Sequence, residues 1–147
     1  MNETRYLLDN VTLSRLSPAQ RTSAFIMRTA RIPSEVLYEA RGLAEIAALS
    51  ELEYEPTLAV LENVRKTLMT LMPTDKLVDL YKNEGNGDVM LIASALTLMM
   101  AEDDLFPDRW IIATDDGGLS AKAGDLGIQT CTTADLRARI DEVGVGQ

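Results

Sequence analysis

Apolar residues along this chain follow two alternating patterns. Residues 5–8 and 110–113 are short apolar runs of the kind found in strands that are buried on both faces. Residues 128–131 are interpreted as the last strand. Longer stretches between these segments carry apolar residues at helical spacing. Because strands that alternate with helices form parallel sheets covered on both faces, the pattern predicts the α/β class.

Capping residues, prolines and glycines delimit the expected helices. Ser17-Pro18 opens the first helix, which continues through Met27. Ser34 is expected to cap the second, whose apolar stripe extends from Val36 to Ala47. The remaining helices are expected at 89–100, apolar all round and therefore buried, at 119–126 before Gly127, and at about 134–143 behind a capping box of Thr132 and Asp135.

A further helix is expected from Thr57 to about Met72, where Pro73 stops it. Residues 53–56 are interpreted as a connection, and 76–81 as either a short strand or a helical turn. Residues 83–87 form a turn-rich loop, and 102–104 a solvated one. The apolar side of the helix that starts at Thr57 comprises Leu58, Leu61, Val64, Leu68 and Leu71.

Length and composition indicate a single soluble domain. The 147 residues suit one domain, 1–147, in which residues 144–147 are expected to form a frayed tail. The longest apolar stretch is shorter than the roughly 18 residues of a membrane span, and the N-terminus lacks a signal-peptide pattern. Cys131 is the single cysteine and cannot form an internal disulfide. We therefore expect a cytoplasmic protein with no membrane partner.

The chain contains no histidine, and its 23 acids against 14 Lys plus Arg give a net charge of −9. The lack of histidine excludes Ser-His-Asp and Cys-His catalysis as well as histidine-ligated zinc. Any metal site must be built from oxygen ligands, which favours magnesium or manganese. The negative charge argues against broad, charge-driven nucleic-acid binding, but not against an enzyme that meets phosphates through metal ions.

Acidic residues follow two of the predicted strands. Asp9 comes directly after the first strand, and Asp115 and Asp116 follow the strand that ends at Ala113. The carboxyl ends of parallel strands meet at one edge of a sheet, where such folds bind ligands. The alternative for Asp9 is that it only caps a following helix.

Two more acids lie on predicted helices that would pack beside this edge. Asp88 precedes the buried helix that starts at Val89, where the helix dipole alone would favour a negative charge. Glu39 lies at the border of an apolar stripe, and its alternative is simple solvation. Carboxylates gathered within a few ångströms would repel one another strongly, and a divalent cation would relieve that repulsion. The joint placement therefore predicts an oxygen-only metal site.

Three arginines form the candidate phosphate-binding patch. Arg21 and Arg28 are seven residues apart on one predicted helix, so they would share a face, and Arg31 follows. The alternative is that all three are solvated surface residues.

In order and context these segments resemble the PIN domain, the small nuclease fold of VapC-type toxins in toxin–antitoxin pairs. The resemblance spans nearly the whole chain and implies a PIN-like three-layer α/β/α sandwich with a central parallel sheet. Asn10 departs from the pattern, since many members have Thr or Ser there, but Asn can still hydrogen-bond a metal-bound water. The resemblance is carried by Tyr6-Leu7-Leu8-Asp9-Asn10, Pro33 to Ala40, Gly87 to Ala95 and Ile112 to Asp116, and residues 119–128 fit the family's helix-then-strand ending.

The resemblance implies metal-dependent hydrolysis of single-stranded RNA. One or two Mg²⁺ or Mn²⁺ ions would bridge the acids, and no protein nucleophile is required. A homodimer and, for a toxin, an antitoxin partner are implied as well. By position, Asp9, Glu39 and Asp88 match the family's three principal acids, Asp116 matches the fourth, Thr114 and Asn10 would support them, and Asp115 is a neighbour that could substitute.

Two other functional classes remain open. The first is a catalytically inactive PIN-like module that binds RNA or a protein. The second is a phospho-acceptor or phosphatase domain. Receiver domains carry paired acids after the first strand and dehalogenase-type phosphatases carry Asp-x-Asp, whereas this chain has Asp9-Asn10-Val11. The sequence therefore argues against the second class.

Overall fold

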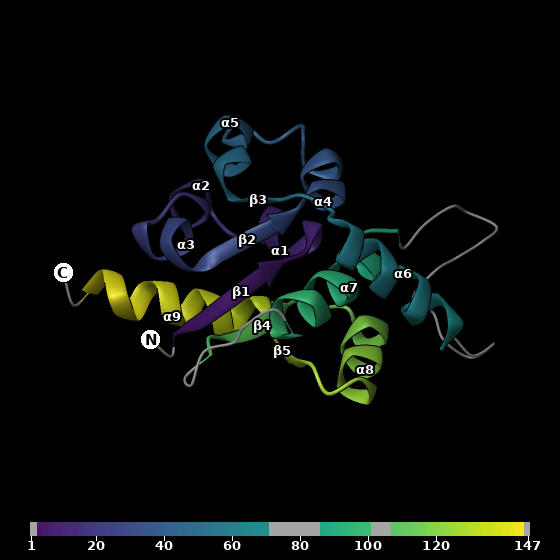
Figure 1. Ribbon diagram of the computed structural model, residues 1–147. Helices are drawn as coiled ribbons and strands as arrows, with labels where there is room; N and C mark the ends of the chain where they lie inside the picture. Colours follow the sequence, from purple (N-terminus) through teal and green to yellow (C-terminus); the bar gives the residue numbers. More distant parts are fainter. Residues whose placement is uncertain (1–2, 71–85, 101–106, 146–147) are drawn as a thin grey trace.

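The computed structural model describes residues 3–70, 86–100 and 107–145 (Figure 1). A single five-stranded sheet in the order β3-β2-β1-β4-β5 forms its centre, and every neighbouring pair of strands is parallel. The predicted α/β class with a central parallel sheet is confirmed. The strands are β1 (Thr4–Leu8), β2 (Ala30–Pro33), β3 (Glu53–Tyr54), β4 (Arg109–Ala113) and β5 (Gln129–Cys131).

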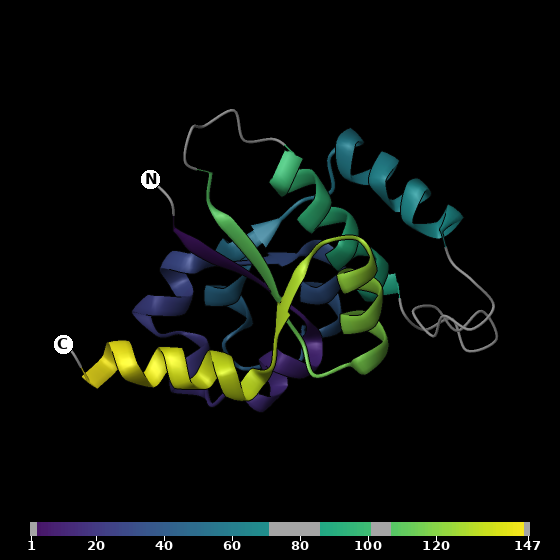
Figure 2. The same cartoon turned by 90° about the horizontal axis from the view of Figure 1, so that it is seen from below.

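Helices cover both faces of the sheet, which gives the three expected layers. Figure 2 shows α9 together with α1, α2 and α3 on one side of the sheet, and α6, α7 and α8 on the other. The helices are α1 (Asn10–Arg15), α2 (Pro18–Arg21), α3 (Ala24–Thr29), α4 (Ser34–Glu39), α5 (Ile46–Leu49), the 3₁₀ helix η1 (Ser50–Leu52), α6 (Leu58–Met69), α7 (Asn86–Met100), α8 (Gly117–Asp125) and α9 (Thr133–Val145).

The strand order contains one topological switch point, between β1 and β4. From β1 the chain proceeds outward through β2 to β3, and it then crosses back to β4 on the other side of β1. Open α/β sheets bind ligands outside the carboxyl ends of the strands at such a point. Leu8 pairs with Ala113, so β1 and β4 end level with each other. The residues that follow these strands therefore emerge side by side.

The buried core fixes this geometry. Leu7, Leu8 and Ile112 are completely buried in the two central strands. Helix α7 packs across β4, β2 and β1, and its residues Leu91 and Ile92 are also completely buried. The prediction that this segment is a buried helix is confirmed. Because α7 lies against the centre of the sheet, its first turn is held at a defined position relative to the strand ends.

The helix expected from Ser17 through Met27 is two helices. Ser17 forms a capping box with Gln20 at the start of α2, and the Ser23 hydroxyl accepts a hydrogen bond from the backbone N–H of Ile26 at the start of α3. A serine inside an apolar helical pattern competes for backbone groups and can start a new helix. The single-helix prediction was wrong because it overlooked this second cap.

The second expected helix is also interrupted. Helix α4 ends at Glu39, and α5 begins only at Ile46. Ser34 is not the cap that was predicted, because it lies inside α4 and its hydroxyl donates to the carboxylate of Glu53, 2.6 Å away. The segment 53–56 was interpreted as a connection, but its first two residues form the edge strand β3.

Helix α6 exposes three leucines of its expected apolar side, Leu58, Leu61 and Leu68, whereas Val64 packs partly buried against the core. Thr57 caps it as predicted, but Asn63 and Thr67 are buried, and the Asn63 side-chain amide donates to the Thr97 hydroxyl at 2.8 Å. Helix α6 ends at Met69 with Thr70 as its C-cap, before the predicted end near Met72. Residues 86 and 87 were expected in a loop but begin α7, and the predictions for 76–81, 83–85 and 102–104 lie outside the described residues. The large exposed apolar residues of this pair of helices are Leu58, Leu61, Leu68, Met69, Met99 and Met100.

The C-terminal predictions are confirmed more closely. Gly127 has φ of 77° and follows the end of α8, as a helix-ending glycine should. Thr132 and Asp135 exchange the two hydrogen bonds of the predicted capping box, at 3.1 and 3.2 Å. Helix α9 continues through Val145, so residues 144 and 145 are helical where a frayed tail was expected. In the described segments, no helix is long and apolar enough to cross a membrane.

Candidate functional site

Asp9 is both a strand-end residue and a helix cap. It follows β1 and precedes α1, and it is only 5% exposed. Its Oδ1 accepts a hydrogen bond from the backbone N–H of Thr12 at 2.7 Å, and its Oδ2 accepts one from the Thr114 hydroxyl at 2.5 Å. Asp9 therefore lies at the carboxyl end of β1, as predicted, and it also caps the helix that follows. These bonds fix the carboxylate, and each of its oxygens keeps a second lone pair.

The Thr114 hydroxyl connects Asp9 with the loop after β4. It donates to Asp9 and accepts a hydrogen bond from the backbone N–H of Asp116 at 3.0 Å. Asp116 in turn caps α8, because its Oδ1 accepts from the backbone N–H of Leu119 at 2.9 Å. One buried hydroxyl thus links two acidic residues that are more than 100 positions apart in the sequence.

We predict that the Thr114 hydroxyl is needed for the stability of this edge. Thr114→Val should lower the free energy of unfolding by about 1–3 kcal/mol, because it leaves a buried carboxylate oxygen and a backbone N–H without their partner. Thr114→Ser keeps the hydroxyl and should lose much less. Urea unfolding of the two variants beside the wild type measures the difference. Equal losses for valine and serine would show that the methyl group matters and the hydroxyl does not.

Glu39 and Asp88 come from two helices that pack against each other. Glu39 ends α4 and Asp88 lies in the first turn of α7. A Cβ atom placed on Gly87 would lie 3.0 Å from Oε1 of Glu39. The glycine therefore allows the Glu39 carboxylate to lie directly against the start of α7, beside Asp88. Figure 1 shows α4 and α1 beyond the arrowheads of β1 and β2, at the same edge of the sheet.

The pKa values show that the four acids interact. Burial and, in decreasing order of importance, the charges of Asp116, Asp9 and Glu39 together raise the pKa of Asp88 from 3.8 to about 7. Burial also raises the pKa of Glu39, and Glu35 and Asp9 add to this effect. Like charges produce such shifts only at short range. Asp9, Glu39, Asp88 and Asp116 therefore share one local environment, although each comes from a different part of the chain.

The four acids of this cluster lack a cationic partner among the residues that the structure describes. Within residues 3–70, 86–100 and 107–145, none of the four acids forms an ion pair with Arg or Lys. As the side chains stand, no three Cys, Asp or Glu residues of these ranges form a group that could hold a metal ion. The donor chemistry nevertheless fits Mg²⁺ or Mn²⁺, since these ions prefer carboxylate oxygens and bind through one or two carboxylates together with waters.

From the burial of Asp88 and its repulsion by the neighbouring acids we predict an unusual pH dependence of the free energy of unfolding. With metal removed by chelator, the free energy of unfolding should fall as the pH rises from 5.5 to 8. Asp88 keeps its proton in the folded protein up to a pH of about 7. In the unfolded chain it loses that proton near pH 4, so the folded state binds more protons throughout this window. The lowered pKa values of Asp108 and Asp115 act below this window.

Urea unfolding at the two pH values, with Asp88→Asn as the matched variant, tests this prediction. The variant should lose most of the pH dependence and gain stability at pH 8. An identical pH dependence in wild type and variant would contradict the interaction between the acids.

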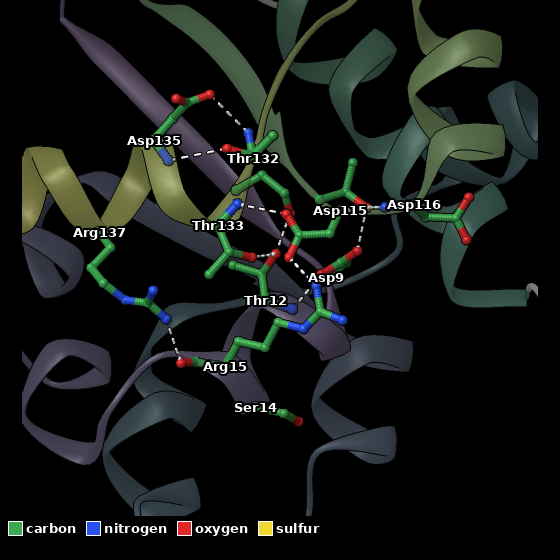
Figure 3. A network of polar contacts seen from close by, with 12 residues as sticks. Asp9, Thr12, Ser14, Arg15, Asp115, Asp116, Thr132, Thr133, Asp135 and Arg137 are labelled. Carbon is green, nitrogen blue, oxygen red and sulfur yellow. Dashed lines mark hydrogen bonds and ion pairs between the residues drawn. The ribbon is translucent and has the colours of Figure 1, made fainter.

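Asp115 and Asp116 have different partners, which the sequence did not distinguish. The Asp115 carboxylate accepts from the backbone N–H of Thr133 at 2.8 Å and from Arg15 at 2.6 Å. The backbone bond and then the side-chain contacts lower the pKa of Asp115. Figure 3 shows the carboxylates of Asp115 and Asp116 pointing in opposite directions. Through its bonds to Arg15 and Thr133, Asp115 connects α1 and α9 to the loop after β4. The charge of Asp116, in contrast, acts on Asp88.

The three arginines do not form a patch at this edge. Arg21 is buried, and its guanidinium donates to the backbone carbonyls of Leu13 and Leu16 and to the Glu45 carboxylate. The structure thus gives Arg21 an internal role in place of the expected phosphate contact.

The other two arginines lie apart from Arg21. Arg28 pairs with Glu3, next to the amino end of β1 and therefore at the opposite end of the strand from Asp9. Arg31 lies in β2, where it donates to the backbone carbonyl of Ala30. The expectation that Arg21 and Arg28 share a face fails because their helix is broken at Ser23.

The supporting residue Asn10 is the first residue of α1 and is half-buried next to Asp9. Cys131 is partly buried, and burial raises its pKa to about 11, which does not favour a nucleophilic thiolate. No protein-family model matches this chain, and no curated protein matches it either.

Proposed function

We propose that this protein is a metal-dependent ribonuclease of the PIN type, which hydrolyses phosphodiester bonds of single-stranded RNA with Mg²⁺ or Mn²⁺. The observation that carries the proposal is the cluster of Asp9, Glu39, Asp88 and Asp116. These four acids lie at the switch point of a parallel sheet, and none of them forms an ion pair with an Arg or Lys in the described part of the chain. A divalent cation is the simplest neutralising partner, and phosphates are its natural second ligand.

The burial and the hydrogen bonds of each acid suggest its role in the proposed site. Asp9 and Asp88 are the proposed direct ligands, because both carboxylates are wholly or partly buried at the centre of the cluster. Asp116 would complete a second metal position. The Thr114 hydroxyl holds the Asp9 carboxylate and the backbone N–H of Asp116 close together, because it hydrogen-bonds both. Glu39, which is exposed, would ligate or orient the attacking water, and Asn10 would support it. Bound metal supplies Lewis-acid stabilisation of the phosphate and lowers the pKa of a water.

Protein residues would handle the protons in this scheme. A carboxylate at Glu39 can accept a proton from the attacking water, since its pKa is raised above the ordinary value and it lies at the open side of α4. The absence of histidine leaves carboxylates as the candidates for this role. Cleavage would proceed by direct attack of water, without a covalent intermediate on the protein.

The biological setting extends this proposal. The protein would act in the cytoplasm as the toxin of a toxin–antitoxin pair, as a homodimer that an antitoxin protein inhibits. A second candidate is an inactive PIN-like module that binds RNA or a protein. One observation favours it, namely that no three described acids are close enough together to hold an ion as they stand. Metal binding would have to draw the carboxylates together.

Removing the metal and adding it back distinguishes the ribonuclease from the inactive module. End-labelled single-stranded RNA should be cleaved by the purified protein in Mn²⁺ or Mg²⁺, cleavage should stop with excess chelator, and added Mn²⁺ should restore it. Asp125→Asn, a change of the same charge on the exposed surface of α8, should cleave like the wild type. RNA that is bound but remains intact at every metal concentration would favour the inactive module.

A further inference from the structure

An exposed aromatic ring lies next to the acid cluster. Tyr38 is 64% exposed and directly precedes Glu39 in α4. Val11, which is 46% exposed, lies in α1, and α1 packs against α4. The other large apolar residues that are exposed in the described segments all belong to α6 and α7. Tyr38 and Val11 are therefore separate from the exposed apolar residues of α6 and α7, and they lie on the two helices that are joined to Asp9 and Glu39.

The ring of Tyr38 is fixed by Arg41. The Arg41 guanidinium lies over the ring, 4.0 Å from its centroid, and Nη1 donates to the Tyr38 backbone carbonyl at 2.7 Å. One face of the ring is therefore covered by a cation, and the high exposure of the side chain leaves the rest of the ring open. Arg41 is itself exposed and makes no ion pair with a described acid. Its remaining N–H groups can bind an anion.

This pair matches the chemistry of an unpaired nucleotide. Bases of single strands stack on aromatic side chains, whereas the faces of bases in a duplex are already occupied. A guanidinium next to the ring supplies the contact for the phosphate of the same nucleotide. Tyr38 and Glu39 are consecutive residues with Cα atoms about 3.8 Å apart. Their side chains point to different sides of α4, but a nucleotide whose base stacks on the ring lies within a short length of strand of any phosphate at the acids.

We propose that Tyr38 and Arg41 form a subsite for one unpaired nucleotide beside the bond that is cleaved. The base stacks on the open face of Tyr38, and Arg41 contacts the backbone phosphate. This inference rests on the proposed function, and it assigns the preference for single strands to a named side chain. A chain with net charge −9 cannot rely on a broad basic surface, so a few local contacts of this kind must supply much of the affinity.

Binding measured without cleavage tests the stacking contact. Labelled single-stranded oligoribonucleotides are titrated with the full chain in excess chelator, and binding is followed by fluorescence anisotropy. Tyr38→Ala should raise the Kd about 5- to 100-fold, as expected for one lost base–aromatic contact. Tyr38→Phe keeps the ring and should bind like the wild type. Because Tyr38 is exposed, both variants should unfold at the wild-type temperature.

A walk of abasic sites along the oligonucleotide locates the base. The wild type should lose affinity when one particular base is removed, and Tyr38→Ala should not lose affinity a second time at that position. Arg41→Gln should reduce the slope of log Kd against log salt concentration by about 0.7, as expected for one lost phosphate contact to a single strand.

Unchanged single-strand affinity in Tyr38→Ala would overturn the subsite, even if the wild type cleaves RNA. Conversely, RNA that Tyr38→Ala binds more weakly but that the wild type never cleaves in Mn²⁺ would support the subsite and contradict the ribonuclease. If Tyr38→Ala separates a wild-type dimer in size-exclusion chromatography and binds RNA normally, Tyr38 is a protein contact and the subsite is overturned. No binding of single-stranded RNA by the wild type would overturn the subsite, whereas the ribonuclease is tested separately by cleavage in Mn²⁺.

Discussion

Asp88→Asn should lose metal-dependent cleavage by at least about a hundredfold while the folded protein becomes more stable at pH 8. Loss of a residue that only supports a metal ligand costs about 10- to 100-fold in affinity or activity, so the loss of a direct ligand should cost more. The gain in stability has a separate cause. Asp88 is the member of the cluster whose charge is opposed most strongly, by burial and by three other acids. A neutral amide of the same shape removes that repulsion.

Initial rates of RNA cleavage in Mn²⁺ and urea unfolding in chelator provide the two readouts for this variant. Opposite signs are the informative result, because a variant that merely unfolds would lose both. Asp125→Asn serves as the control for the change in net charge. Full activity in purified Asp88→Asn would contradict the assignment of Asp88 as a ligand.

Neutralising the two neighbouring aspartates should have opposite consequences. Asp116→Asn should lose most of the cleavage activity and keep its stability, because asparagine caps a helix about as well as aspartate and can still accept from Leu119. Asp115→Asn should keep the acid cluster but lose about 1–2 kcal/mol of stability, because it weakens the bonds to Thr133 and Arg15. The expected pattern is one variant impaired in activity and the other in stability.

Cleavage rates measured well below the unfolding temperature of each variant, together with urea unfolding, distinguish the two aspartates. The converse pattern, an inactive Asp115→Asn beside an active Asp116→Asn, would mean that Asp115 turns toward the metal when it binds. Because the two substitutions are adjacent and change the same charge, each is the control for the other.

The strands and the sheet edge could be predicted because their signals are local. Short apolar runs end at Leu8 and Ala113, and an acid follows each of them. The parallel arrangement then brings these ends together, as observed at Asp9 and Thr114. The order of the strands, and hence the switch point between β1 and β4, could not be derived from the sequence. The strand order depends on where in the sheet the chain re-enters after α6 and α7, and no local sequence pattern indicates this position.

The helix predictions failed where the spacing of apolar residues along a helix did not match the side of the helix that the rest of the protein covers. A leucine stripe on α6 shows that one side is apolar, but not that the rest of the chain covers it. The buried residues of α6 are instead Val60, Asn63 and Thr67, and Asn63 hydrogen-bonds Thr97 of α7. The sequence favoured Asp116 over Asp115 only through the family pattern and left Asp115 possible, because Thr133, which binds Asp115, follows 18 residues later. The spacing of Tyr38 and Arg41 fits a helical pair, and like the cap at Ser23 it is a signal that the sequence interpretation did not use.

The most direct test of a cation site built from these acids is a Mn²⁺ titration followed by the electron paramagnetic resonance signal of free Mn²⁺. The wild type should bind one or two ions, and Asp9→Asn should lose that binding while it stays folded, because asparagine preserves the cap of α1 and can still bond Thr114. Equal Mn²⁺ binding by wild type and Asp9→Asn, or no binding by the wild type, would contradict the assignment.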